Sequence, residues 1–266
     1  MRLFIAVFLV TMIPMAWADS HDPLRLATTT STENSGLLNV LMPEFKKDSG
    51  YQVHVIAVGT GKALRMGRDG DVDVMLVHAP AAEEEFVRQG HGLERHAIMY
   101  NDFVIVGPAS DPAGIAGSDV RVALQSLENS KNTFISRGDD SGTHKKELDL
   151  WKKAGLVSEG LWYREAGQGM GKVLQMASEL QAYTLTDRGT WLALRKNLDL
   201  KLLVEGDELL HNPYSMIAVN PKHYPDTNQL GVNALIKWMI STKAQKLIAA
   251  FKVDGEVLFK PLRLSE

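Results

Sequence analysis

The chain has 266 residues, 45% of them hydrophobic, and a formal net charge of −3 at pH 7. This length and apolar content can bury a sizeable core, in one large domain or in two smaller lobes. The negative charge and the lack of a DNA-binding motif predict no nucleic-acid partner, and the absence of cysteine excludes disulfides, thiolate metal sites and a cysteine nucleophile.

The first 18 residues have the pattern of a secretory signal peptide. Arg2 provides the positive charge, apolar residues fill 3–10 and 12–13, and Ala16-Trp17-Ala18 matches a cleavage site. A membrane anchor is the alternative, but the apolar run is shorter than the ~20 residues that span a bilayer. No cysteine is available to carry a lipid anchor, so residues 1–18 predict a soluble protein exported to the periplasm.

After this segment, short apolar strands alternate with amphipathic helices. We predict strands over 24–28, 52–58, 72–78, 102–107, 133–137, 182–187, 200–206 and 214–221. We predict helices over 35–50, 61–70, 81–90, 118–129, 141–155, 169–180, 188–197 and 228–251. Such alternation is typical of an α/β fold with parallel sheets covered by helices on both faces.

The number of these units exceeds one small sheet, so we predict two Rossmann-like α/β lobes joined by two crossovers. The chain is expected to cross between the lobes near 100–108 and again near 205–214. Lobe 1 is then discontinuous and comprises 19–102 and 212–266, while lobe 2 comprises 103–211.

Clusters of Ser, Thr and Gly follow several of the predicted strands, where open parallel sheets bind their ligands. The five strand-end segments are 28–36, 59–64, 137–145, 165–174 and 186–191, and four of them share this composition. Hydroxyls are short donors, glycine allows close approach, and helix N-termini offer unpaired N–H groups. Each cluster alone could be a helix cap, as in a capping box of Thr30 with Glu33. Together they favour a site for a small tetrahedral anion.

Arg137 is the natural cation for such a site. Its guanidinium offers a fork of donors that matches a tetrahedral oxyanion. The alternative is a surface arginine paired with Asp139 or Asp140, and both interpretations hold if one carboxylate orients Arg137 while the fork faces the ligand.

No enzymatic motif is present. The histidines form no HExxH-type pair, and neither a G-x-S-x-G elbow nor a complete phosphate loop occurs, so we predict no catalysis, no metal site and no cofactor. His144 is interpreted as part of a helix surface, and Glu83–Glu85 as a solvated helix start. The tryptophans at helical positions are expected in the core, namely Trp151, Trp191 and Trp238.

Four segments together resemble the periplasmic tungstate-binding proteins of bacterial ABC transporters: TTTSTENSGLL, VGTGKAL, RGDDSGTHKKE and AGQGMGKVLQMA. The resemblance implies a type II periplasmic binding protein with its ligand in the cleft between two lobes. It further implies that the oxyanion is held by Thr29, Thr30, Ser31, Arg137, Ser141, Gly142 and Thr143. Their strand-end position adds Thr60, Gly61, Gly169 and Met170 as weaker candidates.

The resemblance also implies a partner, the ABC transporter permease in the inner membrane, and we expect a monomer. The sequence does not distinguish tungstate from molybdate as the ligand. A phosphate-binding protein is the alternative, because 137–143 also matches the R-x-D-x-S-G-T pattern of that family. Protonated phosphate rewards a carboxylate acceptor, whereas tungstate and molybdate only accept hydrogen bonds. We therefore expect Asp139 to face Arg137 rather than the ligand, and the TTTS segment favours tungstate.

Overall fold

The computed structural model describes residues 22–262, so the predicted signal peptide at 1–18 lies outside the described residues. The strands are β1 (Leu24–Thr29), β2 (Val53–Val58), β3 (Val74–Val77), β4 (Gly92–Gly107), β5 (Phe134–Ser136), β6 (Tyr163–Glu165), β7 (Thr184–Asp187), β8 (Lys201–Val204), β9 (His211–Val219), β10 (Lys252–Val253), β11 (Glu256–Val257) and β12 (Lys260–Pro261). The α-helices are α1 (Thr30–Asn34), α2 (Leu37–Ser49), α3 (Thr60–Asp69), α4 (Pro80–Arg88), α5 (Val120–Ser130), α6 (Gly142–Lys153), α7 (Met170–Leu180), α8 (Arg188–Leu194), α9 (Gln229–Met239) and α10 (Thr242–Ala250). Two short 3₁₀ turns, η1 (Arg195–Asn197) and η2 (Glu208–Leu210), complete the described chain.

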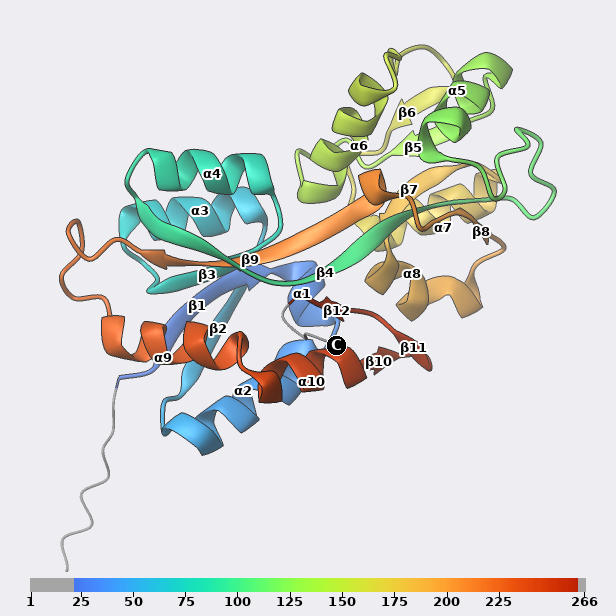
Figure 1. Ribbon diagram of the computed structural model, residues 1–266. Coiled ribbons are helices and arrows are strands. Elements are labelled where there is room, and N and C mark those ends of the chain that lie inside the picture. Colours follow the sequence, from blue (N-terminus) through green and yellow to red (C-terminus); the bar gives the residue numbers. More distant parts are fainter. Residues whose placement is uncertain (1–21, 263–266) are drawn as a thin grey trace, which may run out of the picture.

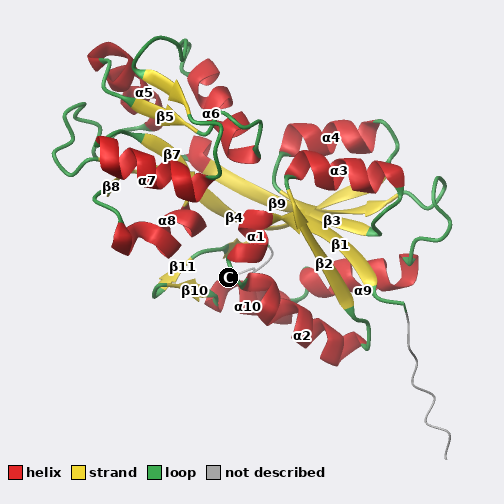
Figure 2. Cartoon of the chain, turned by 180° about the vertical axis from the view of Figure 1, so that it is seen from behind, coloured by secondary structure: helices red, strands yellow, loops and turns green. Residues whose placement is uncertain are grey.

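Two α/β lobes share one mixed sheet, as Figures 1 and 2 show from opposite sides. In the first lobe the strand order is β12-β4-β9-β3-β1-β2. In the second lobe, β7 and β8 pair with the C-terminal end of β4. Helices α3 and α4 cover one face of the first lobe, and α2, α9 and α10 cover the other (Figure 1). The α/β class and the two-lobed architecture predicted from sequence are confirmed.

The expectation of parallel sheets holds for only part of the structure, which has a mixed sheet. Strand β1 pairs in parallel with β2 and β3, and β5 with β6, as expected for crossover helices between neighbouring strands. The two longest strands, β4 and β9, pair with each other and with β3, β7 and β8 in antiparallel fashion. The physical reason is that these two strands carry the chain from one lobe to the other and back.

Strand β4 changes partners in its middle. Its residues from Gly92 to Asp102 pair with β9, whereas Phe103 is the first to pair with β7. The predicted strand over 102–107 is only the last six residues of β4, because Glu94, Arg95 and His96 weaken the apolar pattern of its first half. Because β4 changes partners here, we propose that the lobe boundary on β4 lies between residues 102 and 103. On β9 we propose that it lies between residues 211 and 212.

Other local predictions differ in detail. The predicted helix over 228–251 is two helices, because Ser241 ends the run and caps α10 by accepting the N–H of Ala244 at 3.4 Å. Strand β6 is missed because three mostly exposed residues leave no apolar pattern. Glu83 is buried, whereas the sequence predicted a solvated residue. Its carboxylate accepts a hydrogen bond of 2.9 Å from Nε of Arg95, which lies on β4.

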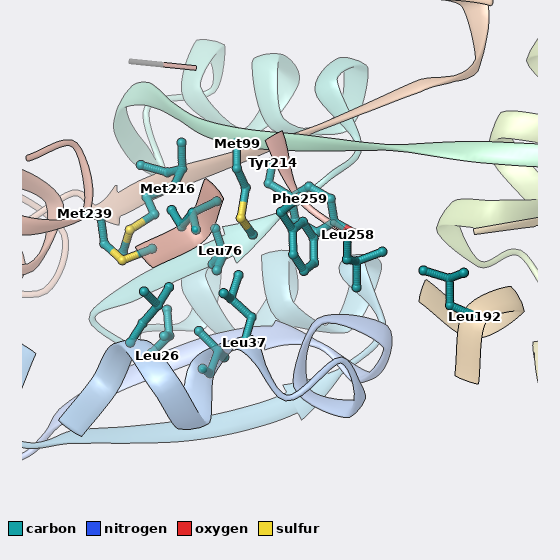
Figure 3. Close-up of a cluster of buried hydrophobic side chains, with 14 of the residues drawn as sticks. Leu26, Leu37, Leu76, Met99, Leu192, Tyr214, Met216, Met239, Leu258 and Phe259 are labelled. Carbon is teal, nitrogen blue, oxygen red and sulfur yellow. The ribbon is translucent and has the colours of Figure 1, made fainter. Parts of the chain in front are cut away.

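The first lobe has a close-packed apolar core. Leu26 of β1, Leu76 of β3 and Met216 of β9 meet Leu37 of α2 beneath the sheet (Figure 3). The three tryptophans expected in the core are buried, which confirms that prediction: Trp151, Trp191 and Trp238. Within residues 22–262, no helix combines the length and the apolar content needed to cross a bilayer.

Replacing Gly107 with alanine is expected to destabilise the fold by about 1–3 kcal/mol, because a new methyl would overpack the core. A Cβ at this end of β4 would lie 2.5 Å from the Tyr183 ring and 2.9 Å from a methyl of Leu203. Chemical denaturation measures the change. Gly59 is the control, because a Cβ there meets nothing within 4 Å, and an equal loss in G59A would contradict the packing explanation.

Candidate oxyanion-binding cleft

A cleft of about 560 Å³ lies between the lobes and is lined by α1 of the first lobe and by the starts of α7 and α8 of the second. Five of the residues predicted from sequence line this cleft together: Thr30, Ser31, Arg137, Gly169 and Met170. They come from three chain segments that are far apart in the sequence. The cleft therefore unites the TTTS segment, the central arginine and the glycine turn before α7.

The TTTS segment forms the end of β1 and the start of α1. Thr29 is the N-cap: its hydroxyl accepts the N–H of Thr32 at 3.3 Å and contacts the hydroxyls of Thr32 and Ser31 at 2.6 and 3.1 Å. The capping-box alternative places this cap on Thr30, one residue too late. Because Thr29 satisfies the helix end, the Thr30 hydroxyl makes no hydrogen bond within the described residues and is available in the cleft.

Arg137 follows β5 in a loop that only a glycine could make. Gly138 has φ +59°, and a Cβ there would lie 2.7 Å from the Cβ of Glu165. The Arg137 Nε donates to Asp139 Oδ2 at 2.7 Å, and Asp139 Oδ1 accepts the Ser141 N–H at 3.1 Å. Asp139 thus faces Arg137, as predicted.

The two remaining guanidinium nitrogens of Arg137 form no hydrogen bond with other described residues, and the side chain lines the cleft. Burial alone would raise the pKa of Asp139, but hydrogen bonds from Ser141 and the charge of Arg137 lower it overall. Asp139 is therefore an ionised carboxylate that orients Arg137 through Nε. The other N–H donors of the Arg137 guanidinium are not used by Asp139.

The start of α7 adds backbone donors. Gly169 is its N-cap and provides no side-chain cap, and no atom lies within 4 Å of a Cβ built there. The first N–H groups of a helix have no partner inside the helix and carry partial positive charge. Lys172, in the same first turn, also lines the cleft and is not among the predicted residues.

Six predicted residues lie outside the lining of this cleft: Thr29, Thr60, Gly61, Ser141, Gly142 and Thr143. Ser141 caps α6 by accepting the His144 N–H at 3.3 Å, and Gly142 approaches the ring of His78. The Thr60 hydroxyl at the start of α3 is buried and has no hydrogen-bond partner among the residues that the structure describes. These residues occupy helix starts, as predicted, but α3 and α6 do not reach the same cavity as α1 and α7.

Sequence reasoning missed the contribution of α8. Asp187, Gly189 and Thr190 line the cleft, although the sequence marks their segment only as a strand end. Asp187 is buried and caps α8, accepting the Thr190 N–H at 2.9 Å and its hydroxyl at 2.7 Å. Both carboxylate oxygens are thus engaged inside the protein, which limits their repulsion of an anion.

Ion pairs connect the lobes beside the cleft. Arg195 donates to Asp254 at 2.9 Å and to Glu256 at 2.6 Å, and Lys196 also pairs with Asp254. Asp254 adjoins Val253, which lines the cleft. Across residues 22–262, no group of three or more His, Asp and Glu side chains is arranged to hold a metal ion.

The chain is similar to known binding proteins over nearly its whole length. A family model described as the PBP superfamily domain matches residues 18–243. The tungstate-binding protein TupA of Peptoclostridium acidaminophilum is 53% identical over 241 residues, which cover 89% of this chain and 84% of the relative.

Two solved structures share both sequence and fold. The tungstate-binding protein TupA of Desulfovibrio alaskensis G20 is 49% identical, with a TM-score of 0.85 over 91% of this chain and 100% of that chain. The tungstate ABC transporter structure from Geobacter sulfurreducens is 52% identical, with a TM-score of 0.79 over 86% of this chain and 99% of that chain. The chain therefore belongs to the PBP superfamily and, within it, to the family of the tungstate-binding proteins.

Proposed function

We propose that this protein captures tungstate, and molybdate where it is present, in the interlobe cleft and delivers it to the permease of an ABC transporter. The observation that carries the proposal is the set of donors around one cavity. Thr30 and Ser31 contribute hydroxyls, Arg137 its free guanidinium nitrogens, and the start of α7 its backbone N–H groups. A tetrahedral dianion offers only acceptors, and hydrogen bonds to a charged group contribute about 1.5–3 kcal/mol each.

The carboxylates near the cleft favour tungstate over phosphate. Asp139 is paired with Arg137 and Ser141, and Asp187 with Thr190. Both carboxylates already accept hydrogen bonds inside the protein, which makes them poorer acceptors for the protonated oxygen that phosphate carries at neutral pH. An unprotonated dianion is the better match to such a site, in agreement with the names of the relatives.

Capture rather than catalysis is the proposed cycle. The lobes close about β4 and β9, the two strands that join them, as in hinged binding proteins. Closure would bring Arg137 and the start of α6, with Thr143, in the second lobe toward the starts of α1 and α3, with Thr60, in the first. The buried Thr60 hydroxyl without a partner supports this role, since such a donor is costly unless a ligand satisfies it.

Delivery to a permease requires export, and we propose that residues 1–18 direct the chain to the periplasm, where it acts as a monomer. The family relatives are transport proteins, and a purified protein that turned over a phosphate ester would contradict this assignment. Size-exclusion chromatography with light scattering, with and without tungstate, tests the monomer.

Calorimetric titration with tungstate, molybdate, sulfate and phosphate in parallel is expected to rank the first two at least about 100-fold tighter than the others. Phosphate carries a proton for which the paired carboxylates are poor acceptors, and sulfate is a smaller tetrahedral dianion than tungstate or molybdate. Tight binding of phosphate with none of tungstate would overturn the proposal and favour the phosphate-binding alternative.

A further inference from the structure

A buried polar chain lies where the two crossover strands leave the first lobe. Asn101 of β4 and Asn212 of β9 are cross-strand partners beside the proposed lobe boundaries, and both are almost fully buried. The Asn212 Nδ2 donates to Asn101 Oδ1 at 2.7 Å, and the Asn212 Oδ1 lies 2.9 Å from Nδ1 of His78. Because that amide oxygen can only accept, Nδ1 carries the hydrogen. The chain therefore ties His78, the residue directly after β3, to the hinge strands.

The ring of His78 has little freedom to move. It stacks on the ring of Tyr214 of β9 with centroids 4.7 Å apart, and Tyr214 in turn packs edge-on against Phe259 at 5.5 Å. Only 9% of His78 is exposed. Burial lowers the pKa of His78 below its ordinary value, so the ring is neutral at neutral pH. It therefore acts through its position and shape rather than through a charge.

The free edge of this ring faces the second lobe. A Cβ built on Gly142, at the start of α6, would lie 3.2 Å from Cε1 of His78, and the next nearest atoms are Nδ1 and Nε2 of the same ring. Both residues also line a cavity of about 450 Å³ between α4 of the first lobe and α6 of the second. The lobes are thus in close approach at His78 and Gly142, while open space separates the facing parts of α4 and α6.

We propose that His78 is an interlobe positioning residue, whose ring is the pivot on which the start of α6 rests and which sets how closely the lobes approach each other around the oxyanion. The inference rests on the proposed function. Because the contact lies beside the hinge strands, a small shift there becomes a larger displacement farther from the hinge. A side chain at position 142 would wedge the lobes apart, and glycine avoids this.

The test combines Gly142→Ala and His78→Asn, alone and together, in calorimetric titrations of the whole mature protein with tungstate. Gly142 has no positive φ, so alanine fits the backbone and its closest neighbours all belong to the His78 ring. We expect G142A to bind tungstate about ten- to a hundredfold more weakly, because the ring cannot give way. This loss is the effect that the second substitution should remove.

The asparagine of H78N can place its amide N–H where Nδ1 stood, which keeps the hydrogen bond to Asn212 and removes the edge that faces α6. H78N alone should weaken binding far less than G142A does. In the double variant the alanine should cost no further affinity, so that binding stays within about threefold of H78N. G142A combined with His144→Asn is the control and should remain as weak as G142A, because His144 is not among the neighbours of the new methyl group.

A distance measurement separates a wedge between the lobes from a local fault in α6. The chain has no cysteine, so spin labels can be attached to Lys47→Cys of α2 and Glu179→Cys of α7, which are exposed positions in different lobes. With saturating tungstate, the labels should lie farther apart in G142A than in the wild type, and the double variant should return to the distance of H78N. H78N alone should broaden the distance distribution, a result that does not depend on the stability of G142A.

Several outcomes would overturn the role of His78. These are wild-type affinity in G142A, a double variant as weak as G142A, rescue of G142A by H144N, or a distance distribution in H78N identical to that of the wild type. Any of them in a protein that binds tungstate refutes this inference alone. A wild type that does not bind tungstate would refute the proposed function as well.

Discussion

Replacing Arg137 with lysine is expected to weaken tungstate binding by about ten- to a hundredfold. The two guanidinium nitrogens that have no partner among the described residues can each donate to one oxyanion edge, in a fixed fork. An ammonium group keeps the charge but loses that fork, and one charge-assisted hydrogen bond corresponds to about 1.5–3 kcal/mol. A lysine at this position would also lack the Nε–H that Arg137 donates to Asp139, the hydrogen bond that orients the Arg137 side chain. Isothermal titration with tungstate measures the effect.

The matched control is Arg164→Lys. Arg164 lies in the same lobe, its Nε donates to the Leu161 carbonyl at 3.3 Å, and it is not among the residues that line the cleft. R164K should bind tungstate as the wild type does. Unchanged affinity in R137K would place Arg137 outside the binding site, and equal losses in both variants would mean that the effect is not specific to the cleft.

Replacing Glu147 with glutamine is expected to stabilise the ligand-free protein by about 3 kcal/mol at pH 8, since a tenfold change in proton affinity corresponds to about 1.4 kcal/mol. The pKa of Glu147 is raised from 4.5 to about 7 in the folded state, because burial disfavours its charged form. The stability contributed by the neutral form is complete below the unfolded-state pKa and is lost as the pH rises through the folded-state pKa.

The free energy of unfolding from urea titrations between about pH 4.5 and pH 8 measures this difference. The wild type should lose stability relative to E147Q across that window, with the two curves meeting at its acid end. Glu179→Gln, at an exposed position of α7, is the control and should follow the wild type. A constant offset between E147Q and the wild type would mean that packing, and not ionisation, explains the change.

Much of the candidate site was predictable because helix starts have local chemical signatures. The TTTS and GQGMG segments predicted donors at strand ends, and Thr30, Ser31, Gly169 and Met170 do line one cleft with Arg137. The orientation of Asp139 was predictable too, since a carboxylate two residues from an arginine on a glycine turn can reach only a few donors. Caps, turns and periodicities operate over a few residues, which a sequence displays directly.

Local patterns in the sequence were enough to predict the α/β class, the order of most strands and helices, and the chemistry of the anion site. Which segments meet in space depends instead on how the folded elements pack. The antiparallel pairing of β4 with β9, the burial of Glu83 against Arg95 and the entry of Asp187 into the cleft all join distant parts of the chain. The separation of α3 and α6 from the cleft of α1 and α7 has the same origin. Such contacts depend on how whole elements pack, and packing leaves no periodic trace in the segments that it brings together.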